Sequence, residues 1–198
     1  MTQNKTNRLP GAWDSTRVLI DKSFICGNCG SDITSNNGYK CSNGTTTASI
    51  YICHHCNRPT LVAPNQQVPA PMLGEEVEHL PKDIEDLYRE IRNTTAAAAF
   101  TSVVLACRKL LMHIAVDSGA EPGQKFLKYV DYLVDNHYTP PNSKVWVDKI
   151  RKLGNDANHE IIIMGSTEAS DILKFIEMIL RFKYEFPGLV QEPETTET

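Results

Sequence analysis

The sequence predicts a mainly α protein in which a small zinc ribbon precedes an all-α bundle of about five helices. Two C-x-x-C pairs lie near the N-terminus, and from Pro81 onward apolar residues recur every three or four positions, as on one face of a helix. Five prolines between residues 59 and 81 favour an extended connection. The expected order is an N-terminal arm (1–23), the zinc ribbon (24–62), a proline-rich linker (63–80), the helical bundle (81–187) and an acidic tail (188–198).

The cysteine spacing is the most specific signal in the chain. Cys26 and Cys29 form the first pair, and Cys53 and Cys56 form the second. Four thiolates at these spacings can complete a tetrahedral zinc site, with one pair on each of two turns. About 40 residues bury too little apolar surface to fold unaided, so we expect a structural Zn²⁺. A catalytic zinc would need one ligand position open to water, and this pattern leaves none.

Other uses of these cysteines fit the sequence less well. A disulfide pair is disfavoured in a chain expected to be cytoplasmic, and a redox C-x-x-C usually accompanies a βαβ pattern, which the sequence lacks. Cys41, His54 and His55 are left over. One of them could replace a cysteine ligand, but four cysteines already fill the site. We therefore interpret these three residues as bystanders.

Shorter signals predict the structure around the two cysteine pairs. Asn36–Gly38 and Asn43–Gly44 indicate turns, and Ser49–Ile52 has the composition of a strand. The arm before the ribbon is polar, with Trp13 as its one bulky residue. We expect Trp13 to anchor the arm at one point.

The apolar spacing in the bundle predicts five helices. Cys107 belongs to the apolar stripe of the second helix, which indicates a core position rather than thiolate chemistry. Arg108 lies at the margin of that stripe, where an arginine is expected to be paired or turned toward a ligand. The helices are expected at about 81–91, at 95–116, at 124–135, from Ser143 onward, and from Ser166 to about Phe186.

A polar cluster lies in and after the fourth helix. Arg151, Asn155 and His159 follow one another at steps of four, so on a helix they share one face. A guanidinium, a carboxamide and an imidazole could together bind a phosphate, orient a hydroxyl and move a proton. The same three residues could instead tie down a loop between helices. Gly154, within the cluster, favours a helix end or a close backbone approach.

Composition and motifs argue against several classes of protein. Residues 1–64 carry a net charge of +3 and residues 65–198 carry −7, so the whole chain lacks the basic excess of most nucleic-acid binders. No apolar run approaches the roughly 18 residues of a membrane span, and the N-terminus has no apolar core of a secretory signal. We expect a cytoplasmic protein without a membrane partner. The glycine motifs of dinucleotide-binding, P-loop and serine-hydrolase sites are missing.

Taken together, the motifs resemble those of a known family. An N-terminal Trp precedes C-x-x-C-G and a second C-x-x-C, and the linker is followed by H-L-P, R-x-x-L, I-R-x-x-G-N-x-x-x-H and Y-E-x-P. This pattern is similar to a widespread bacterial family catalogued as a domain of unknown function, which occurs alone behind a zinc ribbon or fused to restriction enzymes. The resemblance covers His79 to Pro187. Its most specific residues are Ile150, Arg151, Gly154, Asn155 and His159.

That family looks like a branch of the HEPN group of helical bundles. Many HEPN members are metal-independent ribonucleases whose dimer brings two Arg–His motifs together over one RNA strand. The resemblance therefore implies a homodimer formed through the bundle, and RNA cleavage. The chain departs from the pattern at two points. Seven residues separate Arg151 from His159, more than in the usual motif, and Met112 follows R-x-x-L where the related family often has an acid.

Two functions follow from these observations. In the first, the chain is an adaptor that binds nucleic acid (RNA or DNA) or a partner protein, in a setting such as phage defence or restriction. In the alternative, it is a metal-independent HEPN-type endoribonuclease with a site shared across a dimer. There His159 would transfer the proton, Arg151 would stabilise charge on the phosphate and Asn155 would orient one of the two. The acidic balance of the bundle and the longer motif favour the adaptor.

Overall fold

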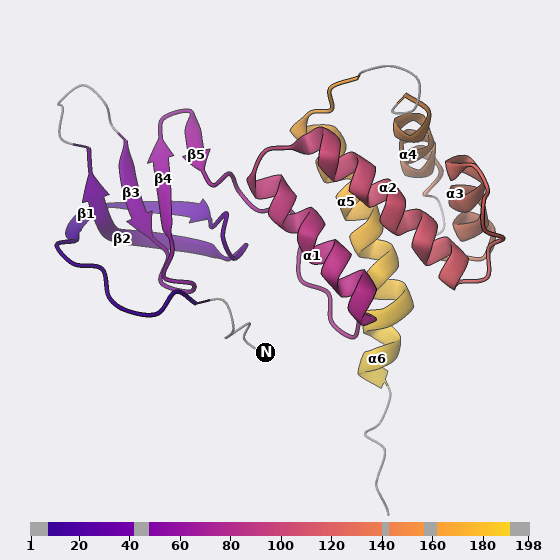
Figure 1. Cartoon of the computed structure of the whole chain (residues 1–198), viewed down its shortest axis with the longest axis horizontal. Coiled ribbons are helices and arrows are strands. Elements are labelled where there is room, and N and C mark those ends of the chain that lie inside the picture. Colours follow the sequence, from indigo (N-terminus) through magenta and orange to yellow (C-terminus); the bar gives the residue numbers. More distant parts are fainter. Residues whose placement is uncertain (1–7, 42–47, 140–142, 157–161, 191–198) are drawn as a thin grey trace, which may run out of the picture. The chain divides into compact units, whose positions relative to one another are not determined.

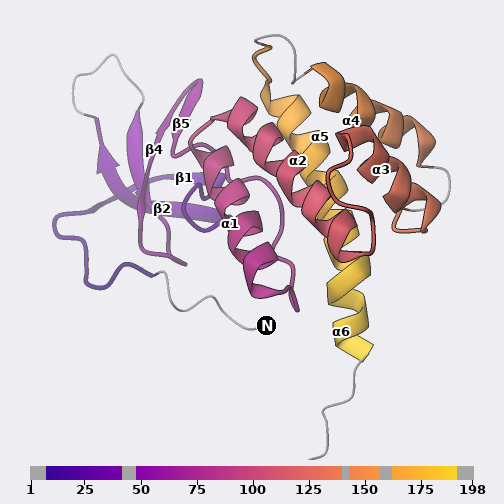
Figure 2. The same cartoon turned by 45° about the vertical axis from the view of Figure 1, so that its right-hand side comes forward.

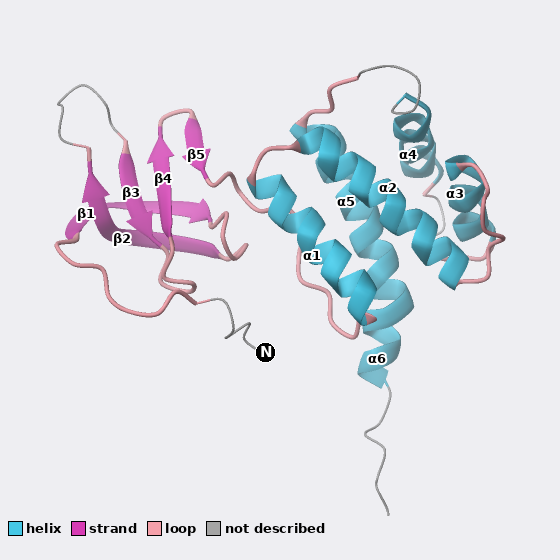
Figure 3. Ribbon diagram, viewed as in Figure 1, coloured by secondary structure: helices cyan, strands magenta, loops and turns pink. Residues whose placement is uncertain are grey.

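A computed structural model describes residues 8–41, 48–139, 143–156 and 162–190, and over 153–156 it describes the backbone alone. The chain divides into two units, residues 1–73 with 92–99, and residues 74–91 with 100–198. The first holds a five-stranded sheet and the second holds most of the helices (Figure 3). Of the described residues, 47% are helical and 18% lie in strands, so the expectation of a mainly α protein is supported only in part.

The sheet of the first unit is antiparallel, and its strands follow one another in chain order (Figure 1). They are β1 (Arg17–Ile25), β2 (Asp32–Lys40), β3 (Ser49–Ile52), β4 (Pro59–Ala63) and β5 (Gln66–Val68). The strand predicted at Ser49–Ile52 is confirmed. The turn predicted at Asn36–Gly38 is wrong, because these residues lie inside β2. Gly38 allows a close approach there, since a Cβ atom at this position would overlap the carbonyl oxygen of Ile50 on β3.

Two expected segments take part in the sheet. β1 begins at Arg17, inside the segment expected as an arm, and β5 lies inside the expected linker. The linker residues that follow β5 are held by hydrogen bonds to the end of the first helix. The backbone N–H of Ala70 donates to Ala96 O (2.9 Å), and that of Leu73 donates to Thr95 Oγ1 (2.9 Å). The turn predicted at Asn43–Gly44 falls outside the described residues.

The helices appear close to the places that the sequence predicts. They are α1 (Lys82–Ala96), α2 (Phe100–Asp117), α3 (Phe126–Asp135), α4 (Lys144–Asp156) and α5 (Ser166–Leu180), followed by a π-helical turn η2 (Arg181–Glu185) and α6 (Phe186–Val190). The predicted start of the second helix, near residue 95, is wrong. Helix α1 continues to Ala96, and Ala98, with a φ of 56°, turns the chain before α2 begins.

Helix α2 is central to the second unit. It packs against α5 and α3, and α4 in turn packs against α3 and α5. Figures 1 and 2 show α2 and α5 side by side from two directions. The predicted core position of Cys107 is confirmed, since this thiol is fully buried and burial raises its pKa. No helix in the described part of the chain is long and apolar enough to span a membrane. Other buried side chains of α2 and α5 include Val104, Leu111, Ile114, Ile172, Phe175 and Ile176.

Candidate metal centre and polar sites

The two cysteine pairs lie on two equivalent turns, one after β1 and one after β3. In the first turn the backbone N–H of Gly30 donates to Cys26 O, and in the second the N–H of Asn57 donates to Cys53 O, both at 2.8 Å. Gly30 and Asn57 also share the left-handed conformation, with φ of 72° and 58°. Asn57 thus occupies a position where glycine is more usual, and asparagine is among the few other residues that tolerate it.

The four cysteine sulfurs have the geometry of a tetrahedral metal site. The Sγ atoms of Cys26 and Cys56 are 3.7 Å apart, and those of Cys29 and Cys53 are 3.8 Å apart. All four Sγ atoms lie within 4.8 Å of one another. A tetrahedron with Zn–S bonds of about 2.3 Å has sulfur–sulfur edges of about 3.8 Å. The predicted ligands are therefore brought together, and they could hold a metal ion such as zinc.

The shifted pKa values of the four thiols also favour metal binding. The hydrogen bond with Cys26 is the largest cause of the lowered pKa of Cys29 and of the raised pKa values of Cys53 and Cys56. Sulfurs this close therefore share protons, with the first proton lost easily and the last held tightly. A divalent cation at their centre removes this conflict, because it stabilises all four thiolates together.

The metal centre is also the core of its unit. Cys26 and Cys53 are fully buried, and all six cysteines of the chain are free thiols, so the disulfide alternative does not occur. Few apolar side chains pack around the sulfurs, and a unit with so small a core would gain stability from a metal ion bound there. The buried residues of this cluster are Phe24, Cys26, Ile33, Tyr51, Cys53 and Cys56.

The first cysteine turn is covered by residues that sequence reasoning did not single out. A Cβ atom at Gly27 would overlap Ala70 O, and one at Gly30 would lie 2.9 Å from Nη2 of Arg92 and 3.4 Å from the sulfur of Met72. Arg92 is 8% exposed. A guanidinium beside this turn would suit a bound metal, because a Zn²⁺ ion with four thiolates would carry a net charge of about −2.

The second cysteine turn is covered by the N-terminal arm. Trp13 Nε1 donates to Asn57 O at 3.0 Å, as expected for an anchor, but Trp13 does not act alone. Arg8 Nη1 also donates to the carbonyl oxygens of His54 (2.5 Å) and His55 (2.7 Å). Both histidine side chains are exposed. Among the described residues, the group able to hold a metal contains the four predicted cysteines and neither of these histidines, nor Cys41.

The predicted polar cluster of α4 is described only at Arg151. Nη2 of Arg151 lies 2.6 Å from Oδ1 of Asp131 on α3, and Nη1 lies 2.8 Å from Oδ1 of Asp148. The hydrogen bond to Asp131 is the largest cause of the raised pKa of Arg151. The side chain of Asn155 and the whole of His159 lie outside the described residues. The three-residue site therefore stays a prediction.

An exposed apolar stripe runs along the C-terminal helices. By its spacing Phe182 belongs to the apolar face of the last helix, but this side chain is 52% exposed. Phe182 and Phe186 are four residues apart, and their rings meet edge to face with centroids 5.4 Å apart. We call Met178, Phe182, Phe186, Leu189 and Val190 the apolar stripe.

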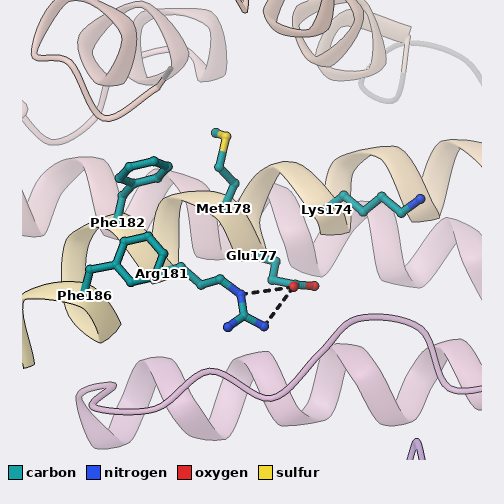
Figure 4. A pocket seen from close by; sticks show the side chains of 6 residues that line it. All are labelled: Lys174, Glu177, Met178, Arg181, Phe182 and Phe186. Carbon is teal, nitrogen blue, oxygen red and sulfur yellow. Dashed lines mark hydrogen bonds and ion pairs between the residues drawn. The ribbon is translucent and has the colours of Figure 1, made fainter. Parts of the chain in front are cut away.

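A shallow groove of about 230 Å³ begins at this stripe. Figure 4 shows Phe182 and Phe186 beside each other and Arg181 turned toward Glu177. The Arg181 guanidinium also binds Glu185 at 2.8 Å. The charged groups of Arg181, Glu177 and Glu185 are thus paired with one another, and the two aromatic rings form the apolar part of the groove. Its lining residues are Lys174, Glu177, Met178, Arg181, Phe182 and Phe186.

These features define a class of protein that combines a small β unit, built around a four-cysteine cluster suited to a metal, with a helical unit. The helical part matches a known family, described as a domain of unknown function (DUF4145), over residues 78–195. The match covers more than half of the chain, and the chain belongs to this family. No curated protein and no solved structure matches the chain.

Proposed function

We propose that the protein is a binding adaptor in which a structural zinc ion holds the β unit and the helical unit docks a protein through the apolar stripe. The zinc assignment rests on the all-cysteine ligand set and on sulfur spacings near those of a zinc tetrahedron. Four thiolates leave no position for water or substrate, which supports a structural role for the metal.

The exposed apolar stripe is the observation that carries this proposal. Leu189 and Val190 are 63% and 81% exposed, and they continue the surface of Phe182 and Phe186. Apolar side chains grouped in this way mark interaction sites, and aromatic residues are enriched in protein interfaces. A second copy of the chain is the occupant we propose, because one helix face can be buried against itself in a two-fold dimer.

The charge distribution favours a protein over nucleic acid as the docked molecule. Residues 65–198 carry a net charge of −7. Arg151, one of the cations that could meet a phosphate, is instead bound to Asp131 and Asp148. Nucleic-acid binding depends mainly on cations that neutralise phosphates, so these observations argue against nucleic acid as the docked molecule.

The test is the solution mass of the wild type and of a Phe182→Glu variant, measured by sedimentation. We expect a dimer for the wild type and a monomer for the variant, since a carboxylate in a buried interface is costly. Val145→Glu is the matched control, because Val145 is 85% exposed on α4 and lies outside the stripe. A monomeric wild type, or a dimer that persists in Phe182→Glu, would contradict the proposed docking surface.

The alternative function is a HEPN-like, metal-independent ribonuclease. Its specific support is that Arg151 and position 155 lie four residues apart on the same helix, as the predicted site requires. Labelled mixed RNA would be incubated with the protein, with and without EDTA, beside Arg151→Ala and His159→Ala. Cleavage that survives EDTA and is lost in both folded variants would establish the enzyme. Intact RNA with a folded, zinc-loaded dimer would favour the adaptor.

A further inference from the structure

A buried arginine in the helical unit has two nitrogen atoms without a hydrogen-bond partner among the described residues. Arg108 lies on α2 and is 6% exposed. Its Nε and Nη1 atoms are enclosed by protein and have no hydrogen-bond partner in the described part of the chain. By contrast, Arg89, Arg151 and Arg181 each bind a carboxylate. A guanidinium stays protonated in proteins, so Arg108 brings a charge into the unit with two of its N–H-bearing nitrogens unsatisfied among the described residues.

One face of the Arg108 guanidinium is covered by an aromatic ring, but the ring does not satisfy its N–H groups. Its Cζ atom lies 4.7 Å from the centroid of the Phe126 ring, so the ring covers one face of the guanidinium. The N–H groups point outward in the guanidinium plane, and a ring stacked on the face does not satisfy them. Met112 stands on the next turn of α2, where a carboxylate could have reached them.

The start of α3 supplies a second set of features that favour an anion. Phe126 is the first residue of this ten-residue helix, and Lys125 precedes it with an extended backbone and no side-chain hydrogen bond to cap the helix. The first N–H groups of a helix and its dipole attract negative charge. Arg108 therefore contacts the first residue of α3 through the Phe126 ring, and the guanidinium and the helix N-terminus favour the same kind of ligand.

We infer that Arg108 and the N-terminus of α3 form an anion site that takes a phosphate or carboxylate group. The planar guanidinium can donate two parallel hydrogen bonds to such a group, and the helix N-terminus can add backbone N–H donors. This site is separate from the four-cysteine cluster and from the apolar stripe. It does not depend on the proposed function.

The inference is tested by calorimetric titration of the zinc-loaded protein with inorganic phosphate and, separately, with acetate, at constant ionic strength set with sodium chloride. We expect saturable binding of at least one anion to the wild type. Arg108→Met should lose at least about tenfold in affinity, because it removes a charged bidentate donor. Lys109→Met, which removes the same charge from an exposed position on the same helix, should bind as the wild type does.

A Met112→Glu variant tests the same idea without removing the arginine. Its carboxylate would lie one helical turn from Arg108 and would compete with the added anion, so we expect weaker binding and a higher melting temperature without ligand. Binding to phosphate rather than acetate would identify a phosphate-type ligand, and the reverse would identify a carboxylate. No binding to the wild type above the chloride background, or equal binding to Arg108→Met and the wild type, would overturn the inference.

Discussion

Nη2 of Arg151 lies 2.6 Å from Oδ1 of Asp131, and this contact joins helix α4 to helix α3. Nε of Arg151 donates to the same carboxylate oxygen at 3.1 Å. The residue that sequence reasoning made the centre of a reactive cluster is thus held by two hydrogen bonds to one carboxylate. A ribonuclease mechanism would have to release this guanidinium before it could meet a phosphate, whereas an adaptor needs no such step.

We predict that the Arg151–Asp131 pair stabilises the fold modestly. Arg151→Gln and Asp131→Asn should each lower the free energy of unfolding by about 0.5–1 kcal/mol, and the double variant should lose less than the sum. The effect is small because the two side chains are 34% and 39% exposed and solvent screens the charges. Urea denaturation of the four proteins measures this coupling. Strictly additive losses would show that the pair contributes nothing.

Asp131→Asn also separates the two candidate functions. This change removes the charge that holds Arg151 and leaves the guanidinium in place. A ribonuclease that uses Arg151 should then keep or increase its activity, whereas Arg151→Gln should abolish it. An Arg151 that acts only as a link between helices would give no RNA cleavage in either variant.

The metal centre was the part of the site best predicted from sequence. C-x-x-C spacing is local, and a left-handed residue such as Gly30 or Asn57 is enough to aim both sulfurs of a pair at one point. Arg8 and Arg92 could not be assigned in this way. Their contacts with the cysteine turns come from segments far away in sequence, and no local pattern encodes such contacts.

The helices were predicted because their apolar spacing is regular, but features that depend on tertiary contacts were missed. Gly38 has the neighbours of a turn glycine, yet its backbone pairs within β2 and β3. Phe182 belongs to the apolar spacing of the last helix in sequence, yet it is exposed, because it follows Lys174 and Met178 on the side of the helix away from the core. Arg108 was expected to be paired or turned toward a ligand, and only the fold shows that it is buried with Nε and Nη1 unsatisfied among the described residues.

We predict that removal of the metal unfolds the β unit and spares most of the helical signal. Cys53→Ser should lose the metal, with a cost on the order of 10 kcal/mol of binding free energy, because structural zinc sites stabilise small units to that extent. Elemental analysis should give one zinc per wild-type chain, and circular dichroism should show the helical content retained. Cys41→Ser is the matched control and should keep its zinc, since Cys41 lies outside the four-sulfur cluster. Full zinc content in Cys53→Ser would contradict the assigned ligands.

We predict that Gly38→Ala lowers the free energy of unfolding by at least about 1–3 kcal/mol. The added Cβ atom would overlap Ile50 O, so β2 and β3 would have to separate at a buried position. Thermal unfolding of the zinc-loaded protein, followed by the near-ultraviolet signal of its aromatic residues, measures the loss. Asn36→Ala, at an exposed position on the same strand, should unfold as the wild type does. Equal melting temperatures for Gly38→Ala and Asn36→Ala would disprove the close approach.

We predict a pH-dependent contribution from Asp117 at the end of α2. Burial alone would raise its pKa, but hydrogen bonds from Lys183 and Tyr184 outweigh burial and lower the pKa below its usual value of about 3.9. A lowered folded-state pKa means that the carboxylate stabilises the fold above about pH 4 and that this contribution is lost as the pH falls through the folded pKa.

Asp117→Asn should therefore be less stable than the wild type at neutral pH, by about 0.5–1 kcal/mol, because the side chain is 48% exposed and its charge is partly screened. The difference should shrink as the pH falls through the lowered folded-state pKa, because the wild-type carboxyl then also becomes neutral. Urea denaturation at a series of pH values measures it, with Glu121→Gln as an exposed acidic control. A difference that stays constant down to acid pH would mean that Asp117 acts through packing rather than through its charge.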